Sequence, residues 1–153
     1  MSVDASELRY VGFWLRVVAT LIDTVLLVIA TAPLNYLVYG TLFSAGGPFN
    51  VRAEFLISWL LPAAGTVGFW VWAQATPGKM AIHARIVDAR TGANPTVSQY
   101  VIRYLGYFVS IVPLFLGVLW VAFDPRKQAW HDKLAGTVVV QPKVVQPAQV
   151  VFK

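Results

Sequence analysis

The chain of 153 residues contains no cysteine and has few charged side chains. The lack of cysteine excludes a disulfide framework, a thiolate metal site and a thiol nucleophile, and it leaves the redox compartment undetermined. Charged residues make up 12% of the chain and hydrophobic residues 58%, whereas about a quarter of a soluble domain is charged. This composition is typical of a membrane protein.

Negative charge is scarcer still, and the net charge is +5. In a soluble protein this excess would raise the question of nucleic-acid binding. Here the basic residues cluster in the predicted loops and the C-terminal tail, where the positive-inside rule and anionic headgroups account for them. We therefore expect the lipid bilayer as a partner, and no nucleic acid.

The first apolar segment, at residues 12–38, is long enough to cross a bilayer, since about 20 apolar residues span the hydrocarbon core. It nevertheless contains Arg16 near its start and Asp23 near its middle. A charge at bilayer depth costs between about 2.5 and 17 kcal/mol, so it must be paired, hydrated or facing protein. Seven helical residues turn through about 700°, which places both charges, and Thr20 nearby, on one face. We expect the other faces to meet lipid.

Residues 1–11 form a short polar lead-in to this segment. Asp4 and Glu7 precede the apolar run, which is too long for the apolar part of a signal peptide and lacks a clean small-residue cleavage site at its far end. We therefore expect the segment to be retained in the mature protein.

Two further apolar segments lie at residues 55–75 and 97–123. The segment at residues 55–75 carries no charge and is expected to span the bilayer. The turn TPGK after it places Lys79 at the headgroup level. The third has a charge-free stretch of about 20 residues, enough for one crossing but not two. Pro113 and Gly117 interrupt it, so we expect a broken helix.

The fold class expected from these segments is an all-α membrane protein with two transmembrane helices plus a broken third segment. Residues 12–140 form the membrane domain, and residues 141–153, rich in Gln and Pro, form a disordered tail. Residues 81–90 alternate in polarity and are rich in β-branched residues, and the turn cluster TGANP follows them. This pattern predicts a small cytoplasmic element resembling a β-hairpin.

The basic residues predict the orientation. They gather around the start of the first segment, between the second and third segments, and after Asp124. The positive-inside rule then places the N-terminus, the middle loop and the tail in the cytoplasm. Because three full crossings would put the tail outside, we favour a re-entrant third segment over a third crossing. We expect a multi-pass protein of a bacterial inner (cytoplasmic) membrane.

Asp23 is the candidate with the most definite chemistry. Desolvation raises the pKa of a buried carboxylate and a nearby cation lowers it, so such a group can exchange a proton or hold a cation. The alternative is a structural pair in which Arg16 and Asp23 satisfy each other. They are separated by a helical rise of about 10.5 Å, which Thr20 or a water would have to bridge.

His131 and Asp132 are adjacent and could suggest a metal site or an acid–base pair. Neighbouring residues on a helix do not face each other, and the spacing to the second histidine, His83, resembles no zinc motif. We therefore expect no metal and no cofactor, and we expect Asp132 to cap a helix or to pair with a basic residue. No nucleophile elbow or phosphate-binding glycine loop is present, so we expect no enzyme.

Three motifs in this order resemble the RDD family of small membrane proteins: GFWLRVVATLIDT, TPGKMAIHARIVD and FDPRKQAWHDKLAGTVVV. The resemblance covers about residues 10–140. It implies that Arg16 and Asp23 are the arginine and the first aspartate for which the family is named, and that Asp132 or, as the alternative, Asp124 is the second aspartate. Supporting residues in the same motifs are Lys79, Arg126 and His131.

The resemblance implies transport of an unidentified ligand, with sodium/proton antiport attributed to some members. In one hypothesis a homo-oligomer exchanges a monovalent cation for protons, Asp23 alternates between protonated and ion-bound forms, and Arg16 tunes its pKa. Some members have two adjacent aspartates where this chain has Asp23 and Thr24. In the other hypothesis the protein is a non-transporting scaffold or accessory protein. Its Arg/Asp set is then structural, and its basic cytoplasmic face binds lipid or a partner protein.

Overall fold

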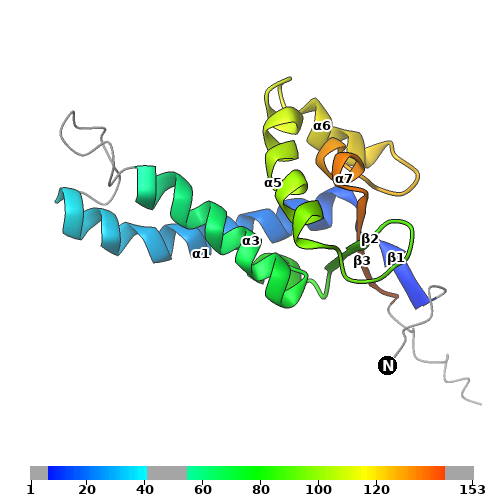
Figure 1. Ribbon diagram of the computed structural model, residues 1–153, viewed down its shortest axis with the longest axis horizontal. Helices are drawn as coiled ribbons and strands as arrows, with labels where there is room; N and C mark the ends of the chain where they lie inside the picture. The colour runs from blue at the N-terminus through cyan, green and yellow to red at the C-terminus, as the bar shows by residue number, and fades with distance from the viewer. Residues whose placement is uncertain (1–6, 41–54, 144–153) are drawn as a thin grey trace, which may run out of the picture.

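A computed structural model describes residues 7–40 and 55–143 of the chain (Figure 1). These residues are mostly helical, and a small three-stranded sheet lies at one end. Helices α1 (Phe13–Tyr39) and α3 (Leu61–Ala73) extend away from the sheet, while α5 (Val97–Ile111) and α7 (Trp130–Ala135) lie close to it. The described chain therefore has a charged, sheet-containing end and an apolar end.

Helix α1 has 27 residues and corresponds to the first predicted segment. Among the described residues, it is the one unbroken helix that is long and apolar enough to cross a membrane, and only 6% of its most apolar window is buried within the protein. It ends where Gly40 adopts a left-handed conformation, φ +70°, that glycine adopts without strain. Such a long exposed apolar surface is suited to lipid or to another protein.

The second predicted segment consists of two pieces. A π-helical turn, η2 (Leu56–Leu60), leads directly into α3, which has 13 residues and ends at Gln74. Pro62 lies just after this turn, and because the helix is continuous there, its missing amide hydrogen removes one intrahelical hydrogen bond at the change from π- to α-helical geometry. The segment is helical as expected, but α3 alone is shorter than the roughly 20 residues of a full crossing.

The third segment is broken, as the sequence predicts. Helix α5 ends at Ile111, and α6 (Leu116–Leu119) continues into the 3-10 turn η3 (Trp120–Ala122) at an angle of 111° to α5. The reversal follows Pro113, where Leu114 and Phe115 both adopt positive φ. A bend of this size suits either a re-entrant segment or a broken span.

The mostly helical fold class is confirmed, but the described residues also form a small sheet, and the predicted hairpin is wrong. Strand β2 (Arg85–Asp88) does not pair with a strand next to it in the sequence. It lies antiparallel to β3 (Thr137–Pro142), whose other edge pairs with β1 (Leu8–Tyr10). The lead-in and the start of the predicted tail thus belong to one sheet, and residues 144–153 of that tail lie outside the described part. The predicted turn at TPGK is instead the start of a short helix, α4 (Pro77–Ala81).

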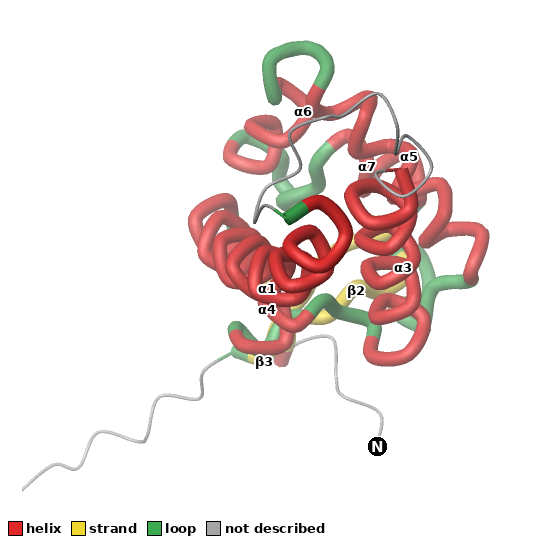
Figure 2. The backbone as a smooth tube through the Cα atoms, turned by 90° about the vertical axis from the view of Figure 1, so that its left-hand side faces the viewer, coloured by secondary structure: helices red, strands yellow, loops and turns green. Residues whose placement is uncertain are grey.

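The main core lies where the sheet meets α3 and α5. Trp70 and Tyr100 pack there with residues from the sheet side, and all are almost fully buried: Val11, Ala84, Ile86 and Val139. In the end-on view, α1 and α4 lie together on one side and α3, α5 and α7 on the other (Figure 2). The candidate site residues lie between these two groups of helices.

Candidate functional site

Arg16 joins the start of α1 to the C-terminal part of the chain. It lies in the first turn of α1, and its Nη1 donates to Oδ2 of Asp132 at 2.7 Å. Its Nη2 donates to the carbonyl of Lys127 at 2.7 Å, and its Nε to the carbonyl of Val11 at 3.2 Å. Because these partners surround the guanidinium on three sides, Arg16 fixes α1 against the loop before α7.

Asp132 binds a second guanidinium, that of Arg103 in α5. Nη1 of Arg103 lies 2.5 Å from Oδ1 of Asp132, and both side chains are 0% exposed. The amide of Ala129 donates to Oδ2 at 3.0 Å, and Arg103 also donates to the hydroxyl of Thr137 at 2.8 Å. Burial alone would raise the pKa of Asp132, but Arg103 and Arg16 hold it well below its usual range. The result is an ionised carboxylate enclosed by two cations, which we call the Asp132 cluster (Arg16, Arg103, Asp132).

Local sequence explains how α5 and α7 approach closely enough for this contact. Asp132 is the third residue of α7, where its carboxylate also caps the helix start. Gly106 on α5 faces α7, and a Cβ there would lie 2.9 Å from the Cα of His131. Any side chain at this position would therefore push the two helices apart.

His131 is buried beside the cluster, with its Nε2 3.6 Å from Oδ1 of Asp132. Its ring stacks on Tyr107 with centroids 3.9 Å apart, and its Nδ1 lies 3.1 Å from the hydroxyl of Ser110. That hydroxyl also accepts from the backbone amide of His131 and donates to the carbonyl of Gly106. Burial lowers the pKa of His131 to about 3, although Asp132 acts in the opposite direction. The imidazole is therefore neutral at physiological pH.

Asp23 does not pair with Arg16; its carboxylate binds the start of α4. Its Oδ1 accepts from the amide of Gly78 at 2.7 Å and its Oδ2 from the hydroxyl of Thr76 at 2.5 Å. A Cβ on Gly78 would lie 2.0 Å from the carbonyl oxygen of Ala19, so only glycine permits this approach of α4 to α1. We call this group the Asp23 contact (Asp23, Thr76, Gly78). The alternative in which Arg16 and Asp23 satisfy each other is wrong, because both are hydrogen-bonded elsewhere.

Two further candidate residues, Asp124 and Arg126, lie away from both of these contacts. Asp124 pairs with Lys133 and accepts from the backbone amides of Arg126 and Gln128. Burial would raise the pKa of Asp124, but Lys133 and these amides hold it below its usual range. Arg126 donates to the carbonyl of Ala89. Asp124 and Arg126 therefore bind partners outside the Asp132 cluster.

Three residues of these contacts were not among the predicted site residues: Arg103, Thr76 and Gly78. Arg103 is the one charge within the third apolar segment, which is the same signal that singles out Arg16. Thr76 and Gly78 carry no such signal, because TPG is also an ordinary turn sequence. Their role depends on a contact with a residue more than 50 positions away.

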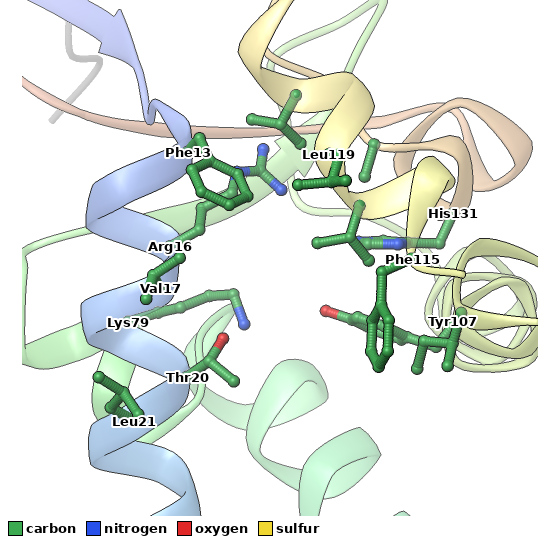
Figure 3. A pocket seen from close by; sticks show the side chains of 14 residues that line it. Phe13, Arg16, Val17, Thr20, Leu21, Lys79, Tyr107, Phe115, Leu119 and His131 are labelled. Carbon is green, nitrogen blue, oxygen red and sulfur yellow. The ribbon is translucent and has the colours of Figure 1, made fainter. Parts of the chain in front are cut away.

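A cavity of about 480 Å³ lies between α1 and the α5–α6 bend (Figure 3). Its polar lining residues are Arg16, Thr20, Lys79, Tyr107 and His131. Its apolar lining residues are Phe13, Val17, Leu21, Ile111, Phe115, Val118, Leu119, Val121 and Ala129. The cavity thus joins candidates of the first motif (Arg16, Thr20) to those of the second and third (Lys79, His131).

Helix α1 and the bent pair of α5 and α6 are long and apolar enough to cross a membrane, which is typical of a membrane protein. The RDD family matches residues 10–136, and the chain belongs to that family. The Arg and Asp residues implied by the resemblance lie within the matched range.

One curated relative is named as a membrane protein, and two others match parts of the chain. An uncharacterized membrane protein of Bacillus subtilis, YteJ, is 27% identical over 146 residues, which cover 88% of this chain and 83% of that protein. An uncharacterized protein of Rickettsia prowazekii is 37% identical over 75 residues, covering 49% of this chain but only 41% of that protein. A proline-rich antigen homolog of Mycobacterium tuberculosis is 28% identical over 93 residues, 56% of this chain and 38% of that protein. No solved structure matches the chain.

Proposed function

We propose that the Asp132 cluster is a structural clamp and that the protein serves as a scaffold or accessory protein of the membrane. The observation that carries this proposal is the complete enclosure of Asp132. Its Oδ2 accepts hydrogen bonds from Arg16 and the amide of Ala129, its Oδ1 forms an ion pair with Arg103, and its side chain is 0% exposed. A carboxylate that exchanges ions must release its partners in each cycle, and releasing two buried guanidiniums would be costly.

The clamp joins the parts of the chain that a scaffold must hold together. Arg16 starts α1, Arg103 lies in α5, and Asp132 lies in α7 next to β3. One buried carboxylate thus connects the apolar helices to the sheet. We propose that the sheet and its basic residues face the cytoplasm of a multi-pass inner-membrane protein, where anionic lipid or a partner protein would meet them. The exposed apolar surface of α1 would contact lipid or a second copy of the chain.

A second candidate, exchange of a monovalent cation for protons, rests on Asp23. Asp23 is half-buried near the middle of α1, and the two groups that donate hydrogen bonds to it, a hydroxyl and an amide, are neutral. A proton or a cation could therefore join this carboxylate without displacing a guanidinium. Arg16 would have no direct part in such a mechanism, because it binds Asp132.

Asp23→Asn separates the two functions. The purified protein is reconstituted into liposomes that contain a pH-sensitive dye, and sodium, potassium or lithium is added outside. The scaffold proposal expects no cation-driven change of internal pH from the wild type. A cation-driven change that Asp23→Asn abolishes, with its thermal unfolding in detergent kept within a few degrees of wild type, would establish exchange and contradict the scaffold. Asp124→Asn is the matched control, since Asp124 lies outside both contacts.

A further inference from the structure

The cavity between α1 and the α5–α6 bend has an apolar mouth and a polar floor. The residues at its mouth are exposed and apolar, with Leu21 61% and Phe115 57% exposed. The polar groups lie deeper, since His131 is 3% exposed and the side chain of Arg16 is 13% exposed. A mouth of this kind opens toward hydrocarbon, whereas a site for a water-soluble ligand would have a polar rim.

The floor of the cavity is positively charged. Arg16 and Lys79 line it, and no carboxylate is among the described residues that do so. Across the cavity and the contacts beside it, three basic side chains (Arg16, Arg103, Lys79) face two carboxylates (Asp23, Asp132). Burial lowers the pKa of Lys79, and an anion bound beside Lys79 would favour its charged form and pair strongly with it at this apolar location.

Lys79 is the cation available to a ligand. Its ammonium donates to the hydroxyl of Thr76 at 3.3 Å, and that hydroxyl in turn donates to Asp23. The close view shows the ammonium of Lys79 and the hydroxyl of Tyr107 pointing into the same space from opposite sides (Figure 3). Arg16 lines the cavity next to them, so three hydrogen-bond donors surround one volume.

We propose that this cavity binds the headgroup phosphate of an anionic phospholipid. Lys79, Arg16 and the Tyr107 hydroxyl contact the phosphate oxygens, and the acyl chains leave through the apolar mouth beside Leu21 and Phe115. The position along α1 agrees with this occupant, because Arg16 lies in the first turn, near the sheet end where headgroups would lie. The volume of about 480 Å³ is also within the range of ligand sites, which run from about 300 to 1,000 Å³. The proposal goes beyond the scaffold function and does not depend on it.

The test measures lipid binding to the full chain in detergent by native mass spectrometry, with phosphatidylglycerol and phosphatidylcholine as the probes. The wild type is expected to bind phosphatidylglycerol at least about tenfold more tightly. Lys79→Gln should lose about tenfold of that affinity, the effect of removing one charged hydrogen bond. Arg90→Gln is the matched control, because it removes the same charge from an exposed turn and should change affinity less than twofold.

A second variant tests the mouth without changing any charge. Leu119 lines the cavity and is 42% exposed, so Leu119→Trp adds volume on the apolar side that the acyl chains would occupy and should weaken binding of phosphatidylglycerol. Inorganic phosphate and glycerol 3-phosphate serve as soluble competitors, and neither is expected to displace the lipid at millimolar concentration.

Three results would overturn the proposal: equal affinity for the two lipids, wild-type affinity in Lys79→Gln, or displacement by the soluble phosphates, which would identify a site for a free anion. The thermal unfolding of each variant, measured without added lipid, shows whether it is folded. If Lys79→Gln is unfolded, Leu119→Trp alone decides, and wild-type affinity in it overturns the proposal.

Discussion

Asp132 and Asp23 are both aspartates in an apolar chain, yet their surroundings differ. Asp132 is fully buried and is enclosed by the guanidiniums of Arg16 and Arg103. Asp23 is half-buried and accepts from a hydroxyl and an amide, at the start of a five-residue helix. The first contact therefore depends on opposite charge, and the second depends on close backbone approach. Variants that change charge or shape should affect the two contacts in different ways.

The largest effect is expected from Asp132→Asn. Removing the carboxylate charge leaves two guanidiniums facing each other in a buried site, which typically costs about 3–5 kcal/mol. Thermal unfolding in detergent should show a markedly lower midpoint. Adding Arg103→Gln should recover part of the loss, because only one cation then remains. A double variant as unstable as the single one would show that the charges do not act as a pair.

Gly78→Ala is expected to rank second. Its Cβ would lie 2.0 Å from the carbonyl oxygen of Ala19, so α4 must move away from α1 and the Asp23 contact must open. Forcing extra volume into such a contact costs about 1–3 kcal/mol. Gly68→Ala in α3 is the matched control, because nothing lies within 4 Å of its Cβ position. The control should unfold at or slightly above the wild-type temperature, and equal losses in both variants would contradict the close-approach explanation.

The smallest expected effect is the change of folding stability with pH that is caused by protonation of His131. The unfolded chain gains a proton at this histidine below about pH 6.5, but the folded chain does so only near its pKa of about 3. The unfolded state thus binds more protons in this interval, and stability should fall as pH falls, by about 1 kcal/mol between pH 6 and pH 5. Asp132 adds nothing in that interval, because its lowered pKa keeps it ionised and its contribution is lost only at more acidic pH.

The pH effect is measured as the midpoint of thermal unfolding between pH 7 and pH 4.5. His131→Gln should flatten the profile, whereas His83→Asn, at the exposed second histidine, should leave it unchanged. Asn is chosen there because His83 has φ +54°, a left-handed conformation that Asn tolerates. A profile that is flat in the wild type would show that His131 takes up its proton over the same pH range in the folded and unfolded states, and would contradict the lowered pKa.

Much of the helical structure could be predicted from local sequence. The apolar length of residues 12–38 predicts α1, and Pro113 together with Gly117 predicts the broken third segment. The strand at residues 85–88 was also predictable from its β-branched pattern. Its partner was not, because strand pairing between residues about 50 positions apart leaves no trace in the local composition. The predicted hairpin failed for this reason.

The candidate site divides in the same way. The sequence by itself determined that Arg16, Asp23 and Asp132 are candidate site residues. Each of these charges lies in or near an apolar segment, where an unpaired charge is costly. Only the tertiary structure decided which charge meets which partner. Helical spacing placed Arg16 and Asp23 on one face, but the packing of α4 against α1 and of α7 against α5 gave each a different neighbour. Partner choice depends on distances between segments that are remote in the chain, and these distances exist only once the helices have packed.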